Sequence, residues 1–594
     1  MDVSFRYKTL PLITQREVIY ARALNEILIK RAWWDKLDDV EVMTRWAAEL
    51  KTSVLSALTE VRSDRNNWQT SRNNGFDGSD AHKYGATVAH VSDLDFAASV
   101  PRFAFAELDW LRKNHLTKYE ANQQQVVITP TSAHGVFLSD SLLSLETKAA
   151  LIAHSEPLEL ASLAAAKWHA GTNRMALDLI HPSDYCLVYG RSMSRNSTAI
   201  ITGSQPITFQ NSNTRTSSDT SQRFQWLPTE FAVSAIGDGE NSSGNYSVLA
   251  CSYINNLHQA LYPDLCNDIE SILATLIPMF ELALGSLDTC PVPRIEAPTD
   301  NEAYQGDEYM WHRNSWIRHQ YGSDADVTNK KLQDDFDNSD ETDDFIDKLG
   351  SRPIALPGLP DEFAPPSTRV ANLPRVILNG RIIKVIIKMA SIHLTPEKPK
   401  YEGGGWHLEG MENEAIAATA IVYYSTFNIT SSRLTFRNVH EDEDSFEYGQ
   451  SDFAGLEKVF DFVNELTENV QTCGQIEAAD GRVVVFPNFL HHRVEPFELV
   501  DKNKNGHRKI LALFLVHPDA VDVKSTTNVC MQQQDWVAQD LFVHVFQHVQ
   551  IPLELVRRIV QFTGGSTMTE KEAANYSNEV MEERKNTKKG GYAN

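Results

Sequence analysis

The hydrophobic and polar positions along the chain follow two different periods. Up to about residue 290, the clearest apolar positions recur at the spacing that gives a helix one buried stripe. One such stripe follows a capping box from Thr14 to Glu17, and another runs from Ile269 to Phe280. The pattern predicts a mainly helical N-terminal region, residues 1–290.

From about residue 376 the apolar positions form short runs separated by turn residues, which is typical of β-strands. Seven or more such strands favour a sandwich, jelly roll or barrel. The runs are residues 381–394, 405–410, 416–424, 433–437, 482–487, 490–497 and 508–516. Helical spacing returns in residues 521–594, which we expect to form C-terminal helices behind a capping box at Thr569.

In residues 291–375 the apolar positions follow neither the spacing of a helix nor that of a strand. Residues 322–351 hold ten acidic residues against three lysines, and a run containing several prolines follows. Such a composition is typical of a solvated connection. We therefore predict a linker or flap here, and an α+β chain as a whole.

Composition and net charge indicate which binding partners and which cell compartment to expect. The chain has 594 residues, 42% hydrophobic and 23% charged, as expected of a globular protein. Its net charge of −24 would repel nucleic acid and anionic membranes, so we expect neither as a partner. We find no signal peptide, no apolar run long enough to span a bilayer, and only scattered cysteines. We expect an intracellular protein, cytoplasmic or nuclear, of unspecified oligomeric state.

Candidate chemistry begins with His407 and Glu409, because residues two apart on a strand point to the same face. This spacing alone is a weak signal. It occurs four times, at His154 with Glu156, His407 with Glu409, His440 with Asp442 and His517 with Asp519. His440 begins an acidic run that reads as a solvated loop, and Pro518 indicates a turn.

Only the pair at 407 and 409 has a later partner. In the run from Leu490 to Pro496 the apolar positions share their parity with His492, so His492 is predicted to face inward. A single inward histidine is commonly a core residue. Two imidazoles and a carboxylate with open coordination positions, however, form the facial triad of non-haem Fe(II) oxygenases.

A basic residue completes the pattern. Arg508 opens the apolar run from Ile510 to Val516 and can pair bidentately with the distal carboxylate of 2-oxoglutarate. Lys509 is its rival at opposite parity. Tyr423 and Tyr424 either add a hydroxyl to the same carboxylate or close the core.

The chain resembles a large, mostly fungal family of long proteins with no assigned function. The motifs that carry this resemblance follow in order as Gly403 to Glu414, Val485 to Asn488, His492 to Leu499 and Gly506 to Val516, with earlier ones at residues 225–231 and 252–258. The resemblance therefore spans most of the chain.

The C-terminal part of that family in turn resembles the double-stranded β-helix of 2-oxoglutarate- and Fe(II)-dependent dioxygenases. This resemblance implies a double-stranded β-helix (jelly-roll), oxygenase-like domain over residues 376–520, with Fe(II), 2-oxoglutarate and O2 as cofactor and co-substrates. It implies His407, Glu409 and His492 as catalytic metal ligands, Arg508 as the 2-oxoglutarate anchor and Tyr423 beside it.

Two departures qualify the resemblance. Glu409 stands where the commonest pattern has Asp, although some active members also use Glu. Histone-demethylase-like members place a lysine on an earlier strand, where this chain has only Arg433 and Arg437 as basic residues.

The function implied is an oxidoreductase that hydroxylates or desaturates a C–H bond of a small molecule or peptide, releasing succinate and CO2. Two alternatives stay open. One is a non-catalytic binding or scaffold protein with a degenerate β-helix, and the other is a cupin-like metalloenzyme that does not use 2-oxoglutarate. Arg508 separates them, because a buried arginine without an anion is costly.

Overall fold

A computed structural model gives the architecture of the chain. It describes residues 8–68, 87–121, 124–195, 205–209, 219–236, 245–300, 303–304, 308–349, 354–365, 376–440, 446–447, 455–461, 470–549, 551–563 and 565–590.

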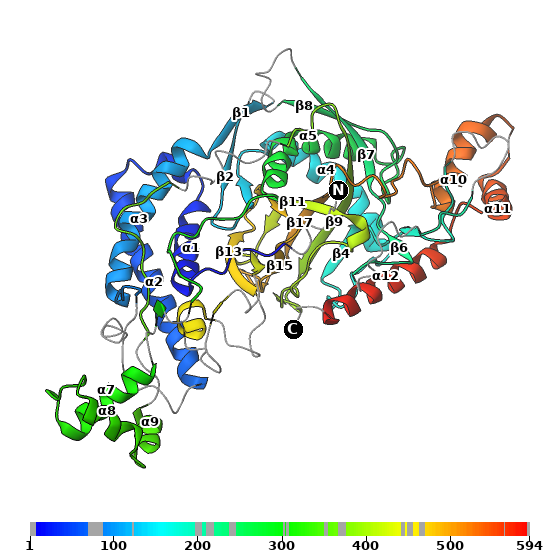
Figure 1. Cartoon of the computed structure of the whole chain (residues 1–594). Helices are drawn as coiled ribbons and strands as arrows, with labels where there is room; N and C mark the ends of the chain where they lie inside the picture. The colour runs from blue at the N-terminus through cyan, green and yellow to red at the C-terminus, as the bar shows by residue number, and fades with distance from the viewer. Residues whose placement is uncertain are drawn as a thin grey trace.

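A ten-stranded antiparallel sheet lies at the centre of the molecule (Figure 1). Its strands are β1 (Thr117–Ala121), β2 (Gln124–Pro130), β3 (Phe137–Ser139), β4 (Ala176–Ile180), β7 (Thr229–Ala235), β8 (Tyr246–Ala250), β9 (Ile382–Leu394), β11 (Ile416–Phe427), β14 (Val483–Pro487) and β17 (Gly506–Val516). They lie in the order β1-β2-β3-β14-β11-β17-β9-β7-β8, and β4 also pairs with β9. Strands β11 and β17, most of whose residues are buried, lie in the middle of the sheet.

Three smaller sheets accompany it. They are β13 (Val470–Glu477) with β12 (Arg433–Val439) and β15 (His491–Val494), β10 (Lys400–Tyr401) with β16 (Phe497–Glu498), and β5 (Leu187–Val188) with β6 (Phe224–Gln225). The three-stranded sheet packs on the large one, since the rings of Phe436 and Phe486 have centroids 5.0 Å apart. We call the face of the large sheet that carries Phe486 its inner face.

Helices surround the sheets. The α-helices are α1 (Gln15–Leu28), α2 (Val40–Trp68), α3 (Asp93–Asn114), α4 (Leu145–Ala164), α5 (Pro263–Gly285), α7 (Glu308–Tyr321), α8 (Lys330–Asp337), α9 (Thr342–Leu349), α10 (Gln534–Leu541), α11 (Leu553–Thr563) and α12 (Glu570–Gly590). Shorter helical turns are η2 (Trp33–Asp35), η4 (Glu412–Glu414), η6 (Leu456–Phe460), η7 (Phe542–Phe546) and η8 (Gln547–Val549). Helices α4 and α5 contact β11 from the face opposite the three-stranded sheet. Helices α1 to α3 share a separate core and reach the sheets through β13.

The predicted helix starts are confirmed at both ends of the chain. The Thr14 hydroxyl accepts the Glu17 N–H (3.1 Å) at the start of α1, and the Thr569 hydroxyl accepts the Glu572 N–H (3.2 Å) at the start of α12. Each cap satisfies a backbone donor that the first turn leaves free.

The N-terminal region is less exclusively helical than predicted. Six of its strands, β1 to β4, β7 and β8, join the large sheet formed by the C-terminal strands. These strands are short and lie between helices, so their alternation is too brief to read from sequence. The sheet thus joins residues of the regions 1–290 and 376–520.

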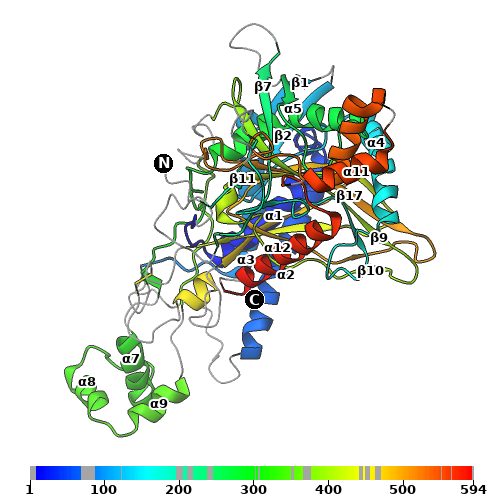
Figure 2. The same cartoon turned by 90° about the vertical axis from the view of Figure 1, so that its right-hand side faces the viewer.

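Two local predictions were wrong. Residues 405–410 form no strand apart from a bridge at His407, because Gly403 (φ +88°) and Gly410 (φ +65°) adopt left-handed conformations that break the strand. The acidic segment 322–351 contains α8 and α9, since Phe336 is buried against Trp316. Figures 1 and 2 both place α7 to α9 apart from the sheet.

Among the described residues, no helix is both long and apolar enough to cross a lipid bilayer.

Candidate metal centre

His407, Glu409 and His492 converge beside the three-stranded sheet. Oε1 of Glu409 lies 3.6 Å from Nε2 of His407 and 3.5 Å from Nε2 of His492. One ligand atom from each residue falls within 4.8 Å of the other two. With metal–ligand bonds of about 2.0–2.2 Å, such atoms can share one ion. The structure therefore brings together the three residues predicted as ligands.

The backbone fixes the two histidines relative to each other. His407 N–H donates to the carbonyl of His492 (3.1 Å), and His492 N–H donates to that of His407 (3.0 Å). His492 lies on β15, which is held in register by β12. The segment around His407 thus extends the three-stranded sheet by one bridge, and the two imidazole rings lie 4.3 Å apart at their centroids.

A backbone hydrogen bond orients the imidazole ring of His407. Nδ1 of His407 lies 2.9 Å from the carbonyl of Gly405. A carbonyl only accepts, so Nδ1 donates this hydrogen bond, and Nε2 is directed toward Glu409. Orientation of an imidazole through its other nitrogen is the usual support of a metal ligand.

Glu409 is buried as an anion. Burial alone would raise the pKa of this carboxyl, but the imidazoles of His407 and His492 lower it well below its usual range. Asn488 fixes the backbone of Glu409: its Oδ1 accepts the Glu409 N–H (3.0 Å), and its Nδ2 donates to the Glu409 carbonyl (2.9 Å). The carboxylate is thus held in the form that binds a cation.

Arg508 lies on the inner face and is only 3% exposed. Its Nη1 donates to the hydroxyl of Ser432, while its guanidinium carbon lies 5.0 Å from the ring of Phe497 and 5.8 Å from that of Tyr423. Its Nε has no hydrogen-bond partner, and no carboxylate pairs with it in the described part of the chain. Burial lowers the pKa of Arg508, which measures the cost of this unneutralised cation.

The rival Lys509 points the other way. Its ammonium pairs with Glu159 of α4, on the outer face of the large sheet. Tyr423 shares the side of Arg508, because it lies opposite Ile510 in the register of β11 and β17. Tyr424 has the opposite parity and is fully buried. The structure therefore places Tyr423 and Arg508, but neither Lys509 nor Tyr424, on the inner face.

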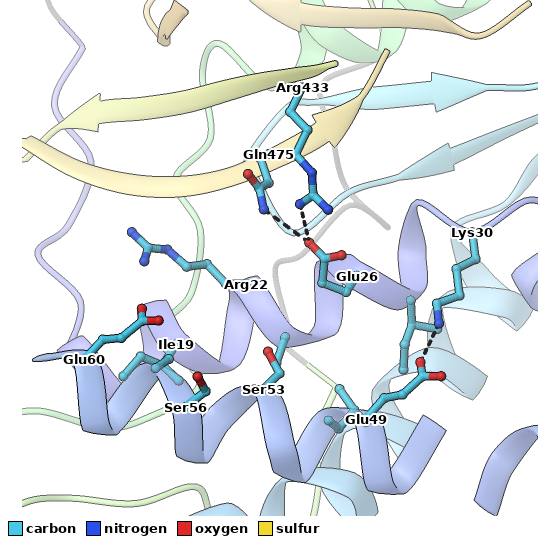
Figure 3. Close-up of a pocket in the computed structure, with 14 residues that line it drawn as sticks. Ile19, Arg22, Glu26, Lys30, Glu49, Ser53, Ser56, Glu60, Arg433 and Gln475 are labelled. Carbon is cyan, nitrogen blue, oxygen red and sulfur yellow. Dashed lines mark hydrogen bonds and ion pairs between the residues drawn. The ribbon is translucent and has the colours of Figure 1, made fainter. Parts of the chain in front are cut away.

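The two arginines of the earlier strand have other partners. Arg433 pairs with Glu26 (3.1 Å), which also accepts a hydrogen bond from Gln475. These residues line a cavity of about 510 Å³ between α1, α2 and the strands β12 and β13 (Figure 3). Arg437 lies over the ring of Trp406, at 4.7 Å.

The other three pairs of like spacing form no comparable cluster among the described residues. His154 lies on α4 and contacts Asp268 (2.7 Å). His517 follows β17 and accepts the N–H of Asp519 (3.3 Å), which is the predicted turn. Asp442, the partner of His440, lies outside the described residues.

A second convergent group, His169, Asp178 and His181, was not predicted. Nδ1 of His169 contacts Asp178 at 2.9 Å. The Ser183 N–H donates to Nδ1 of His181 (3.2 Å), so a neutral His181 carries its proton on Nε2. That proton makes His181 a hydrogen-bond donor in this cluster, and a metal would have to displace it. The sequence around Asp178 gives no sign of this group, because the face that Asp178 occupies is set by the pairing of β4 with β9.

The family described as "Protein of unknown function (DUF4246)" matches residues 102–540, more than half of the chain. Among solved structures, a selenomethionine-labelled Fe(II)/(alpha)ketoglutarate-dependent dioxygenase, TqaL, is similar at 13% identity and a TM-score of 0.16, over 28% of this chain and 52% of that one. An oxalate decarboxylase–formate complex from Lactobacillus farciminis is similar at 14% identity and a TM-score of 0.11, over 41% of this chain and 60% of that one. The chain thus spans about half to three-fifths of the length of these proteins. No curated protein matches.

Proposed function

For this chain, which belongs to the DUF4246 family of proteins of unknown function, we propose the activity of a 2-oxoglutarate- and Fe(II)-dependent dioxygenase. One oxygen atom of O2 enters the C–H bond of a small-molecule or peptide substrate, and the other enters succinate as 2-oxoglutarate loses CO2. In a desaturation the substrate loses two hydrogens, and one oxygen atom leaves as water. The bound iron supplies the activation of O2.

The observation that carries this proposal is the buried Arg508, which has no anionic partner among the described residues and lies on the sheet face that looks toward the triad. A guanidinium in this position costs free energy unless a ligand neutralises it. The distal carboxylate of 2-oxoglutarate meets that need with two parallel hydrogen bonds. A buried arginine of this kind favours an anion-binding pocket over a degenerate scaffold.

The donor set fits Fe(II). In the proposal, His407, Glu409 and His492 hold the ion through two imidazoles and one carboxylate and leave coordination positions for 2-oxoglutarate and O2. Asn488 keeps Glu409 in place through the two backbone hydrogen bonds. Tyr423 covers Arg508 from the neighbouring strand and keeps water from it.

The order of the strands supports a double-stranded β-helix. In the large sheet β14, β11, β17 and β9 are neighbours, and in the facing sheet β13, β12 and β15 continue into the segment of His407 through its bridge to His492. Consecutive strands along the chain therefore alternate largely between two facing sheets. In the proposed jelly roll, the ligands come from one sheet and the anchor Arg508 from the other.

An anaerobic titration with Fe(II) and 2-oxoglutarate tests the proposal. The chelate should give a weak visible charge-transfer band, which His492→Ala should abolish and Arg508→Ala should shift to much higher 2-oxoglutarate concentration. His544→Ala and Arg45→Ala change exposed residues far from the site and serve as matched controls. A folded wild-type protein that binds neither Fe(II) nor 2-oxoglutarate would favour the scaffold. Metal binding without any effect of 2-oxoglutarate would favour the cupin-like enzyme.

A further inference from the structure

Lys388 lies on the inner face of the large sheet, as does Arg508. In the register of β9 and β17, Ile392 lies opposite Arg508 and Lys388 lies opposite Ala512. Directly opposed residues share a face, and residues four apart on a strand do so as well. Lys388 and Arg508 therefore point to the same side of the sheet, two pleats apart.

Asp178 joins Lys388 on this face from the neighbouring strand. It lies opposite Ala390 in the register of β4 and β9, so it has the parity of Lys388. Its carboxylate contacts Nδ1 of His169 at 2.9 Å, and its side chain is 15% exposed. Lys388 and Asp178 thus form a pair of opposite charges on adjacent strands.

Lys388 and Asp178 lie on the sheet face that looks toward the triad, because Phe486 of the same face contacts His492, with ring centroids 4.8 Å apart. Burial opposes ionisation of both Glu409 and Asp178, and Lys388 is among the charges that lower the pKa of each. In the described part of the chain, none of the ion pairs within 4.0 Å includes Lys388.

The sum of the charges around Lys388 and Asp178 indicates which net charge a bound ligand should have. With the proposed cofactors in place, the charges of Fe(II), 2-oxoglutarate, Glu409 and Arg508 cancel. Lys388 and Asp178 also cancel, and burial lowers the pKa of His181 to about 3, so that this imidazole is neutral. A ligand with a net charge would leave that charge uncompensated in a half-buried site. A ligand with one positive and one negative group would leave none and, unlike an uncharged ligand, would pair with both Lys388 and Asp178.

We propose that Lys388 and Asp178 bind the head group of a zwitterionic, amino-acid-like substrate, Lys388 holding its carboxylate and Asp178 its ammonium. This inference rests on the proposed function, because it assigns the substrate class of the same site. It makes both residues specificity determinants and leaves the side chain of the amino acid directed toward the metal.

Isothermal titration calorimetry with the standard protein amino acids tests the inference. Each is titrated anaerobically into the metal-free protein and into protein loaded with Fe(II) and 2-oxoglutarate. For an amino acid that binds, we then compare its amide, which lacks the carboxylate charge, and its N-acetyl derivative, which lacks the ammonium. Both derivatives should bind about tenfold more weakly or worse, as expected when a charged hydrogen bond is lost.

Two variants test which residue binds each charged group of the amino acid. Lys388→Met should weaken the amino acid about tenfold or more but the amide little, and Asp178→Asn should weaken the amino acid but the N-acetyl derivative little. Lys502→Met removes the same charge from an exposed loop and should change nothing. If circular dichroism shows either variant to be misfolded, Lys388→Gln and Asp178→Ser replace them.

The outcomes separate the two proposals. If no amino acid binds to either form of the protein, or both variants bind it like the wild type, the inference is overturned. If the chelate band forms but no amino acid binds, only the substrate class is wrong. A third outcome is that no chelate band forms but the metal-free protein binds an amino acid, and that this binding depends on Lys388. This outcome would support the inference and contradict the proposed dioxygenase activity.

Discussion

The side chain of Asn488 forms a two-point clamp on the backbone of Glu409, accepting its N–H at 3.0 Å and donating to its carbonyl at 2.9 Å. The same amide donates to the carbonyl of Ile416 (3.1 Å) at the start of β11. A ligand in an irregular segment is thereby tied to the most regular part of the sheet.

Asn488→Ala should weaken metal binding without unfolding the protein. It removes the clamp and leaves buried backbone groups unpaired, so we expect about 10–100-fold lower affinity for Fe(II) and a loss of about 1–3 kcal/mol in unfolding free energy. Metal titration and urea denaturation measure the two effects. Asn503→Ala, on an exposed turn, is the control. Unchanged metal affinity in the folded Asn488 variant would show that the clamp does not position Glu409.

Glu409→Asp should also weaken metal binding, although Asp is the commoner residue in the resembling dioxygenases. The backbone at this position is fixed by Asn488, so the shorter side chain cannot advance to compensate. A metal ligand that is poorly positioned typically lowers metal affinity by about 10–100-fold, and we expect a loss of this size here. Metal affinity is again the measurement, with the exposed Glu397→Asp as control. An affinity equal to that of the wild type would mean that the segment moves freely.

Arg508→Met should abolish the binding of 2-oxoglutarate without lowering the stability of the ligand-free protein. Removing a buried guanidinium that lacks a carboxylate relieves its desolvation, so the unfolding free energy without ligand should not fall and could rise by about 1 kcal/mol. The same variant should lose the 2-oxoglutarate-dependent band. Urea denaturation of the metal-free protein gives the first value and the anaerobic titration the second. A marked loss of stability would mean that Arg508 serves the core.

The ion pair between Lys509 and Glu159 should make stability depend on pH. Burial raises the pKa of Glu159, but hydrogen bonds from His393 and Lys509 outweigh it and lower the pKa to about 2. Because the folded-state pKa is below the unfolded value near 4.5, this stabilisation is complete above pH 4.5 and is lost as the pH falls toward 2.

The comparison with Glu159→Gln isolates this effect. The difference in unfolding free energy between wild type and variant should shrink by about 2 kcal/mol from pH 6 to pH 3. Denaturant titrations at both pH values measure it. A difference that stays constant would show that Glu159 is not preferentially ionised in the folded state.

The sequence prediction of the site rested on the alternation of inward and outward positions along a strand. The alternation from Leu490 to Pro496 predicted that His492 faces inward, and the same two-residue period set Arg508 and its rival Lys509 on opposite faces. A sequence displays this period directly. Which of the two faces of Arg508 and Lys509 is the inner one is known only from the structure. The functional roles of these residues stay predictions.

Other features depend on pairing that no local pattern reveals. Asp178 and Lys388 become neighbours only because β4 joins β9, and the two lie more than two hundred residues apart in the chain. Asn488 belongs to a recognised motif, but its contact with Glu409 crosses between segments. The segment of His407 was read as a strand because His-x-Glu fits one, whereas the flanking glycines decide its path.

The mixed origin of the large sheet has a consequence for biosynthesis. The ribosome releases β1 to β4, β7 and β8 before any of the strands β9, β11, β14 and β17 that they flank. β7 cannot pair with β9 until Leu394 has emerged, and β3 cannot pair with β14 until Pro487 has emerged. Until then their unpaired edges are prone to associate with other chains. The nascent protein must therefore keep its first half apart from neighbouring chains until these strands have emerged.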